Sequence, residues 1–253
     1  MKAQFLTDRG LVRDHNEDSG GIYYNSSGQL LAVIADGMGG HRAGDVASHM
    51  AVSIIEKHWN ENKEFSSPEQ VEEWFLKTLQ TINTAIYEEA QKNDEYTGMG
   101  TTIVATISTE EFVTVAHIGD SRCYLYNEDG FKQITEDHSL VSELVRSGQI
   151  SQEEAVHHPR KNIVLKALGT EENVIADVQS LSWNKGNKLL LCSDGLSDKV
   201  SMQELSDFIT STNSLKETAQ SLVDLANERG GEDNISLVLI SYRSTAKVGE
   251  SEC

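Results

Sequence analysis

Short runs of apolar, β-branched residues recur along the chain and are separated by polar or glycine-containing segments. Runs of this length without a polar face predict strands, several of them buried on both sides. Strands of that kind need layers packed against both of their faces. The five clearest runs are LLAVIA (30–35), TTIVATI (101–107), FVTVAHI (112–118), LLLCS (ending at Ser193) and ISLVLIS (235–241).

Two pairs of helices are predicted between these strands. Apolar residues recur at helical spacing within 46–55 and again within 71–86, between the first two strands. Two further helical stretches, 202–209 and 215–228, lie between the fourth and fifth strands. Because groups of strands alternate with pairs of helices, we expect an α+β layered domain with helices packed outside mostly antiparallel sheets.

The chain has the length and composition of one globular domain, with 253 residues, of which 38% are apolar and 24% charged. We expect this domain to span residues 1–244 and to be followed by a polar tail at 245–253. The stretch from about residue 137 to 162 is polar and contains several histidines. We interpret it as a helix-poor, mobile flap over one edge of the domain.

The charge balance restricts the possible partners. The chain has 21 basic and 40 acidic residues, a formal net charge of −19, so binding to nucleic acid or to anionic membranes is not expected. The longest apolar run, 30–35, is far too short to span a bilayer, and the N-terminus has no apolar signal segment. Three cysteines without a CxxC pair favour a reducing compartment, so we expect a cytoplasmic protein.

Aspartates stand repeatedly at the ends of predicted strands, namely Asp36, Asp120, Asp194 and Asp233. Carboxylates that converge raise one another's pKa, and they stay ionised together only with cations between them. Ligands that are all oxygen favour Mg²⁺ or Mn²⁺ over zinc. The alternative is that each is an ordinary turn aspartate, because DG and GD pairs are common in turns.

Two further segments add candidate chemistry. In VRDHNEDS (12–19), Arg13 could hold a phosphate, and Glu17 and Asp18 could bind waters on a metal ion. In the glycine-rich segment that follows the first run, Gly37 lets a backbone carbonyl approach a cation closely. This segment is not a P-loop, because no Gly-Lys-Ser/Thr follows it.

Eight motifs together resemble one protein family. They are VRDHNED, DGMGGHRAGDVAS, GMGTT, HIGDSRCYL, ITEDHS, HPRKNIVLKALG, LCSDGLSD and GEDNIS, and they run from Arg13 to Ser236. In this order they resemble the metal-dependent, type 2C serine/threonine protein phosphatases in their short bacterial form. The resemblance implies a four-layer α/β/β/α sandwich, with two mostly antiparallel sheets flanked by helix pairs and a dinuclear Mn²⁺ or Mg²⁺ centre at one end.

The same resemblance assigns roles to the candidate residues. It implies that Asp36 bridges the two ions and that the Gly37 carbonyl binds one of them. Asp194 and Asp233 would bind the other ion, and Arg13 would bind the substrate phosphate. A water held between two cations has a lowered pKa and can attack phosphorus directly, so no covalent phosphoenzyme is needed.

Three more roles follow from the resemblance. Glu17 and Asp18 would order metal-bound waters. A third, weaker ion would use Asp120 together with Asp194 and Asp198. The implied substrates are phosphoserine and phosphothreonine proteins, including a membrane-anchored Ser/Thr kinase and that kinase's own substrates, and nothing in the sequence demands more than a monomer.

The proton donor to the leaving group stays unassigned. Eukaryotic members of the family have a histidine after the DG pair, where this chain has Met38. His41, three residues further on, is one candidate, and a metal-bound water is the other. The remaining histidines, His117 among them, show no HxxxH or HxH ligand spacing, so we interpret them as structural.

Two other hypotheses compete with a free-standing phosphatase. A catalytically silent docking relative should have lost a metal carboxylate or the arginine, yet Arg13, Asp36, Asp194 and Asp233 are all present. A regulatory phosphatase with sensor domains would need a longer chain. For the phosphatase, we expect changes in the predicted flap to affect phosphoprotein substrates more than a small aryl phosphate.

Overall fold

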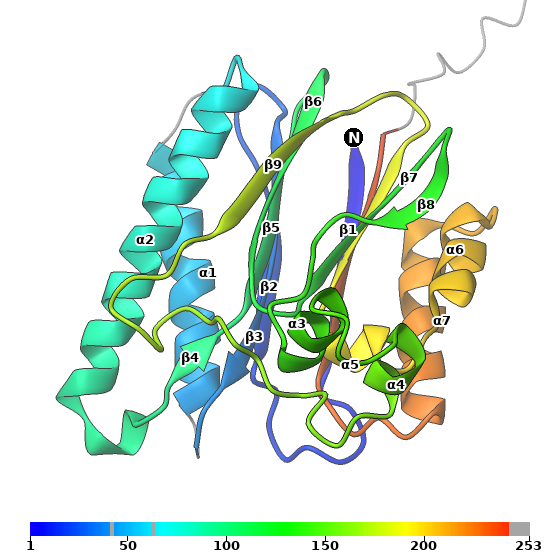
Figure 1. The fold of residues 1–253 in the computed structure, drawn as a ribbon. Coiled ribbons are helices and arrows are strands. Elements are labelled where there is room, and N and C mark those ends of the chain that lie inside the picture. Colours follow the sequence, from blue (N-terminus) through cyan, green and yellow to red (C-terminus); the bar gives the residue numbers. More distant parts are fainter. Residues whose placement is uncertain (41–42, 62–63, 243–253) are drawn as a thin grey trace, which may run out of the picture.

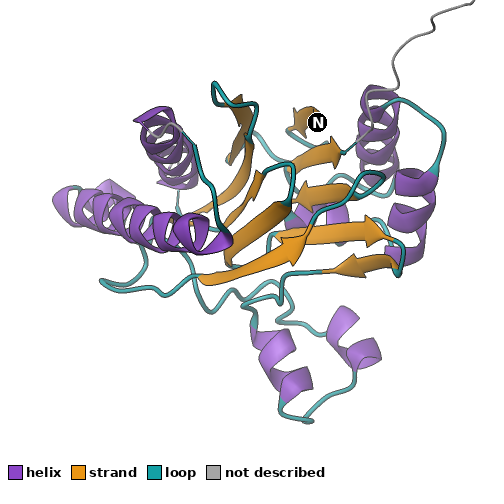
Figure 2. Ribbon diagram, turned by 90° about the horizontal axis from the view of Figure 1, so that it is seen from above, coloured by secondary structure: helices purple, strands orange, loops and turns teal. Residues whose placement is uncertain are grey.

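The computed structural model describes residues 1–40, 43–61 and 64–242, and these residues form four layers (Figure 1). Two antiparallel sheets lie face to face in the middle, and a pair of long helices covers the outer face of each sheet (Figure 2). The predicted α+β sandwich is therefore confirmed. His41 and the predicted tail at 245–253 lie outside the described residues.

The first sheet has the strand order β1-β11-β10-β7-β8. These strands are β1 (Lys2–Asp8), β11 (Ile235–Ser241), β10 (Lys188–Cys192), β7 (Arg122–Asn127) and β8 (Gly130–Gln133). The two ends of the described chain thus pair with each other, because β1 runs antiparallel to β11 with Lys2 opposite Ser241.

The second sheet has the order β2-β3-β5-β6-β9, with a short β4 paired to the end of β3. Its strands are β2 (Asp18–Tyr24), β3 (Leu30–Met38), β4 (Gly100–Thr101), β5 (Ile103–Ser108), β6 (Phe112–Ile118) and β9 (Asp177–Ser182). In the register between β2 and β3, Asp18 stands directly opposite Asp36.

The helices follow the predicted pairs. One pair is α1 (Ala43–Glu61) with α2 (Pro68–Lys92), followed by a short 3₁₀ turn, η1 (Asp94–Tyr96), and the other is α6 (Met202–Thr210) with α7 (Leu215–Glu228). Three short helices complete the described elements, α3 (Leu140–Arg146), α4 (Gln152–Val156) and α5 (Asp194–Ser197).

The core consists of three apolar layers. Successive residues of a central strand point to opposite faces of its sheet and therefore belong to different layers. In β3, Leu30, Ala32 and Ile34 face the other sheet, whereas Leu31 and its alternate neighbours face α1 and α2. In β10, Leu190 packs toward α6 and α7, while the residues beside it lie between the sheets. This period of two explains why these runs are apolar on both sides, as predicted.

The predicted flap is not helix-poor, so this expectation was wrong. Helices α3 and α4 stand outside the four layers, in front of the sandwich in Figure 1. Each begins at a serine that accepts a hydrogen bond from a backbone N–H, Ser139 for α3 and Ser151 for α4. With seven and five residues, they are too short to produce a helical period in the sequence. Among the described residues, no helix is both long and apolar enough to cross a membrane.

Candidate active site

Acidic side chains from both sheets meet at one end of the sandwich. Asp18 begins β2 and Asp36 lies near the end of β3, so the second sheet contributes both. Asp194 begins α5 directly after β10, and Asp233 lies two residues before β11, so the first sheet contributes these. Asp120 lies in the turn between β6 and β7, where the chain passes from one sheet to the other.

Burial and mutual repulsion raise the pKa values of these carboxyl groups. The pKa of Asp36 is raised well above its ordinary value by burial first and then by the charges of Asp18 and Asp194. The pKa of Asp194 is raised in the same way, by burial and then by the charges of Asp120 and Asp233. Asp18 is buried and Asp36 and Asp194 are partly buried, so water screens their charges less than it would at an open surface.

Burial also dominates at Asp18 and Asp120. It raises the pKa of Asp18 to about 6, although hydroxyl groups of Ser236 and Ser193 partly offset the shift. It raises the pKa of Asp120 to about 6 as well, with the charge of Asp137 as the next cause. Without added positive charge, this group of carboxylates therefore opposes its own ionisation near neutral pH.

Two carboxylate oxygens in the group are buried and have no hydrogen-bond partner among the described residues. They are Asp18 Oδ1 and Asp194 Oδ1. Buried charged oxygens are costly unless they are paired or bind a cation. All the candidate ligand atoms here are carboxylate or carbonyl oxygens. Hard divalent cations prefer such ligands, so the residues fit Mn²⁺ or Mg²⁺.

Gly37 lies where β3, α1 and the segment before β2 pack closely against one another. Its N–H donates to the Glu17 carbonyl oxygen at 3.1 Å. A Cβ at this position would lie 2.1 Å from the carbonyl oxygen of Gly44 and 2.7 Å from that of Glu17. No residue with a side chain fits there without moving the backbone of α1 or of the segment before β2.

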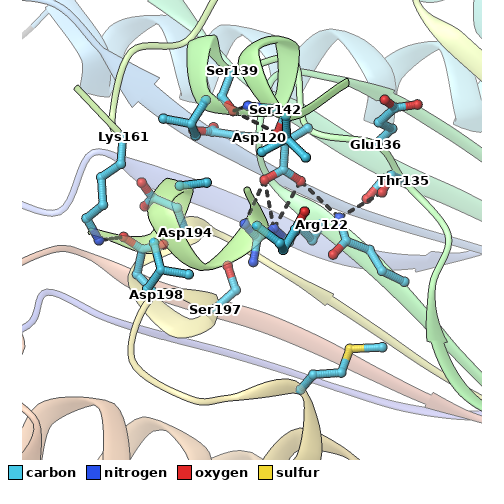
Figure 3. A pocket seen from close by; sticks show the side chains of 18 of the residues that line it. Asp120, Arg122, Thr135, Glu136, Ser139, Ser142, Lys161, Asp194, Ser197 and Asp198 are labelled. Carbon is cyan, nitrogen blue, oxygen red and sulfur yellow. Dashed lines mark hydrogen bonds and ion pairs between the residues drawn. The ribbon is translucent and has the colours of Figure 1, made fainter. Parts of the chain in front are cut away.

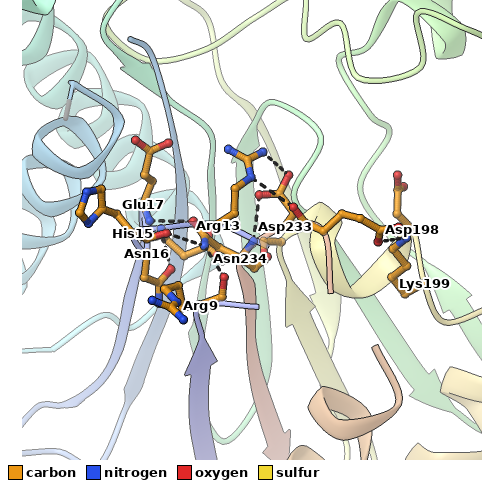
Figure 4. Close-up of polar contacts among 12 residues, drawn as sticks. Arg9, Arg13, His15, Asn16, Glu17, Asp198, Lys199, Asp233 and Asn234 are labelled. Carbon is orange, nitrogen blue, oxygen red and sulfur yellow. Dashed lines mark hydrogen bonds and ion pairs between the residues drawn. The ribbon is translucent and has the colours of Figure 1, made fainter. Parts of the chain in front are cut away.

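Arg13 lies beside Asp233 at the rim of the acidic group (Figure 4). Its Nη2 donates to Asp233 Oδ2 at 2.7 Å, and its Nε donates to the Glu232 carbonyl oxygen at 3.3 Å. The Arg13 side chain is 47% exposed, so an anion from solvent can reach it. Glu17 is partly buried nearby, and burial raises its pKa while the charge of Arg13 lowers it.

Asn234 is a residue of the site that was not predicted from the sequence. Its Nδ2 donates to the carbonyl oxygens of Arg9 and His15 at 2.8 and 2.9 Å, and its Oδ1 accepts from the Glu17 N–H at 2.7 Å (Figure 4). The side chain thereby holds both ends of the segment that contains Arg13. The available signal was its place in GEDNIS, directly after Asp233 and one residue before a buried strand.

A cavity of about 690 Å³ opens beside the acidic group, between the sandwich and the helices α3 and α4 (Figure 3). Asp120, Asp194 and Asp198 line one part of it. Asp198 Oδ2 forms a salt bridge with Lys161 Nζ at 2.5 Å, so a side chain of the predicted flap contacts the acidic group directly. The structure thus brings the three residues predicted for a third ion to one cavity.

A second group of possible metal ligands, His117, His138 and Asp177, lies near the base of α3, with ligand atoms within 4.8 Å of one another. The hydrogen bonds of His138 argue against a metal ion at this group. His138 Nδ1 accepts from the Gly119 N–H at 3.1 Å, which leaves the proton of a neutral ring on Nε2, facing Asp177 at 3.4 Å. A metal ligand needs the opposite arrangement, with a lone pair on Nε2. The structural interpretation of His117 is therefore consistent with these contacts.

Solved structures with the same fold are phosphatases. The serine/threonine phosphatase Stp1 from Staphylococcus aureus superposes with a TM-score of 0.90 at 40% identity and covers 96% of this chain and 95% of its own. The catalytic domain of the phosphatase PstP, solved in complex with two manganese ions, superposes with a TM-score of 0.84 at 32% identity and covers 96% and 98% of the two chains. The fold and the acidic site together therefore define the class of metal-dependent phosphatases.

Sequence comparison identifies the family. The family described as Protein phosphatase 2C matches residues 12–229. The serine/threonine phosphatase stp of Listeria innocua is 47% identical over 240 residues, which is 95% of each chain. The chain belongs to the protein phosphatase 2C family, as the eight motifs predicted, and it is a serine/threonine phosphatase of this type, whose substrates are phosphoproteins.

Proposed function

We propose that this chain removes phosphate from phosphoserine and phosphothreonine in proteins at a centre of two divalent cations. The observation that carries the proposal is the group of converging carboxylates, in which two buried oxygens, Asp18 Oδ1 and Asp194 Oδ1, lack hydrogen-bond partners among the described residues. A relative of the same fold, the PstP catalytic domain, was solved with two manganese ions. Asp36, the Gly37 carbonyl, Asp194 and Asp233 would hold the two ions.

When bound, the cations supply positive charge to the phosphate oxygens and lower the pKa of the attacking water. The residues of the chain do the rest. Arg13, partly exposed beside Asp233, binds the phosphate through its guanidinium and sets its orientation. Asp18 and Glu17 accept hydrogen bonds from waters at the centre. Asp18 is itself fixed, because Ser193 Oγ donates to its Oδ2 at 2.8 Å.

Asp120, Asp194 and Asp198 would hold a third, weaker cation in the cavity. The bond between Asp198 and Lys161 supports a role of the flap in this part of the site. We further propose that the enzyme is a cytoplasmic monomer and that it reverses the action of a membrane-anchored Ser/Thr kinase. The cell compartment and the kinase rest on the sequence features and the family resemblance.

The test is hydrolysis of p-nitrophenyl phosphate and of a phosphothreonine peptide with Mn²⁺, with Mg²⁺ and with EDTA. We expect hydrolysis with Mn²⁺ that EDTA abolishes. The variant Asp233→Asn should lose at least a hundredfold in kcat because it removes a cation ligand, while the exposed control Asp129→Asn should match the wild type. Folded protein that hydrolyses neither substrate with either metal would overturn the proposal and favour a silent docking relative.

A further inference from the structure

The cavity beside the acidic group has an apolar wall that hydrolysis of a phosphate does not require. This wall consists of Val141 and Val145 of α3, Ala155 and Val156 of α4, and Val200 and Met202 before and at the start of α6. Val156 is 61% exposed and Met202 is 43% exposed. Two apolar side chains this exposed, next to the partly buried Val141 and Val145, indicate a binding surface.

The apolar wall and the acidic group belong to one continuous cavity. Asp120 and Asp194 line the same space as Val145 and Val156. Asp194 is followed by Gly195, where an added Cβ would lie 3.3 Å from the Cβ of Asp233, the partner of Arg13. A peptide whose phosphate lies at Arg13 therefore has the apolar wall within reach of its neighbouring side chains.

The three basic residues that line the cavity each have an acidic partner within the chain. Arg122 makes a bidentate contact with Asp137, with its Nη2 2.6 Å from Oδ2, and Lys161 is bonded to Asp198. Arg146 is bonded to Glu143. An acidic side chain of a substrate would have to displace one of these pairs, whereas an aliphatic side chain would only remove apolar surface from water.

We infer that the cavity binds an aliphatic side chain close to the phosphorylated residue, so that the enzyme prefers phosphoproteins with Leu, Ile or Val at that position. This inference rests on the proposed function and names its substrate class. A volume of about 690 Å³ lies in the range of ordinary ligand pockets, and it has room for such a side chain together with adjoining backbone.

The experiment uses phosphothreonine peptides of glycine and serine in which leucine replaces glycine at each neighbouring position in turn. Burying one leucine side chain corresponds to roughly tenfold in kcat/KM or more, and we expect this preference at one or two positions. The variants Val156→Ser and Val145→Ser should reduce the preference severalfold. Ile163→Ser is the matched control, because Ile163 is an apolar residue directly after the predicted flap, 39% exposed, that does not line the cavity.

Hydrolysis of p-nitrophenyl phosphate separates the possible failures. This substrate is too small to reach the apolar wall, so all four proteins should hydrolyse it at the same rate. Equal rates without any leucine preference, or a preference that the valine variants keep, overturn the inference but leave the proposed function standing. A dimer in sedimentation that Val156→Ser dissociates assigns the wall to a second copy and also overturns it. Absence of aryl phosphate hydrolysis in the wild type overturns the proposed function and this inference with it.

Discussion

Replacement of Asp18 by asparagine should make the metal-free protein more stable while it impairs the enzyme. Asp18 is 5% exposed, and its pKa in the folded protein is about 6, against an ordinary value of 3.8. Because the folded state holds the proton more tightly than the unfolded state, Asp18 destabilises the fold increasingly as pH rises from about 4 to 6. This difference in the pKa of Asp18 corresponds to a loss of about 3 kcal/mol in the free energy of unfolding, and the loss is complete above pH 6.

Asparagine keeps the shape and an oxygen that can accept from Ser193 Oγ, but it carries no charge. In EDTA at pH 7.5, Asp18→Asn should therefore raise the free energy of unfolding by up to about 3 kcal/mol, or Tm by roughly 6–12 °C. At pH 4 the two proteins should be equal. Activity with Mn²⁺ should fall, because the variant no longer offers a carboxylate to water at the centre.

Urea unfolding in EDTA across this pH range measures the effect, with the exposed Asp129→Asn as the control. Mn²⁺ should then stabilise the wild type more than the variant, because the cation offsets a repulsion that the variant lacks. A variant that is no more stable than the wild type at pH 7.5, or equally more stable at pH 4, would refute the assignment of the destabilisation to this carboxylate.

Two further substitutions test the residues around the centre. Arg13→Ala should raise KM for aryl phosphate roughly ten- to a hundredfold, because it removes a charge-assisted hydrogen bond to the phosphate, and it should affect kcat less. Steady-state kinetics measures both constants. An unchanged KM would mean that another group holds the phosphate. Asn234→Ala removes three hydrogen bonds to the segment before β2 and should lower the free energy of unfolding by about 3 kcal/mol and raise KM, measured by urea unfolding and kinetics. Stability lost without a change in KM would show that Asn234 does not position Arg13.

The sequence predicted the elements that are buried on both sides. β6 and β11 have the bounds of their apolar runs, and α7 begins and ends at the predicted residues. The two strands lie in the interior layers, where nearly every residue must be apolar, so their pattern is strong. α7 covers an outer face, and its buried residues recur at helical spacing. The outer strand β9, DVQSLS, has one face toward solvent and little apolar surface, so its residues carry no comparable signal.

The acidic site was predictable for a related reason. An aspartate that follows a buried strand lies at the edge of a sheet, and when several strands end in this way their side chains can converge. Asn234 could not be predicted in the same way, since its function depends on three backbone groups between residues 9 and 17, more than 200 positions away in the chain. The pairing of β1 with β11 brings these segments together.

The two sheets are joined differently at the site than in the interior. Between the sheets the contacts are apolar, but at this end Ser193, from the first sheet, donates to Asp18 of the second and accepts from the Ser236 N–H at 3.0 Å. A polar connection is needed there because apolar packing would leave no room for carboxylates and water. The same connection keeps Asp18 buried although burial raises its pKa. Because the carboxylates repel one another, the free energy contributed by the apolar layers is what holds them close together.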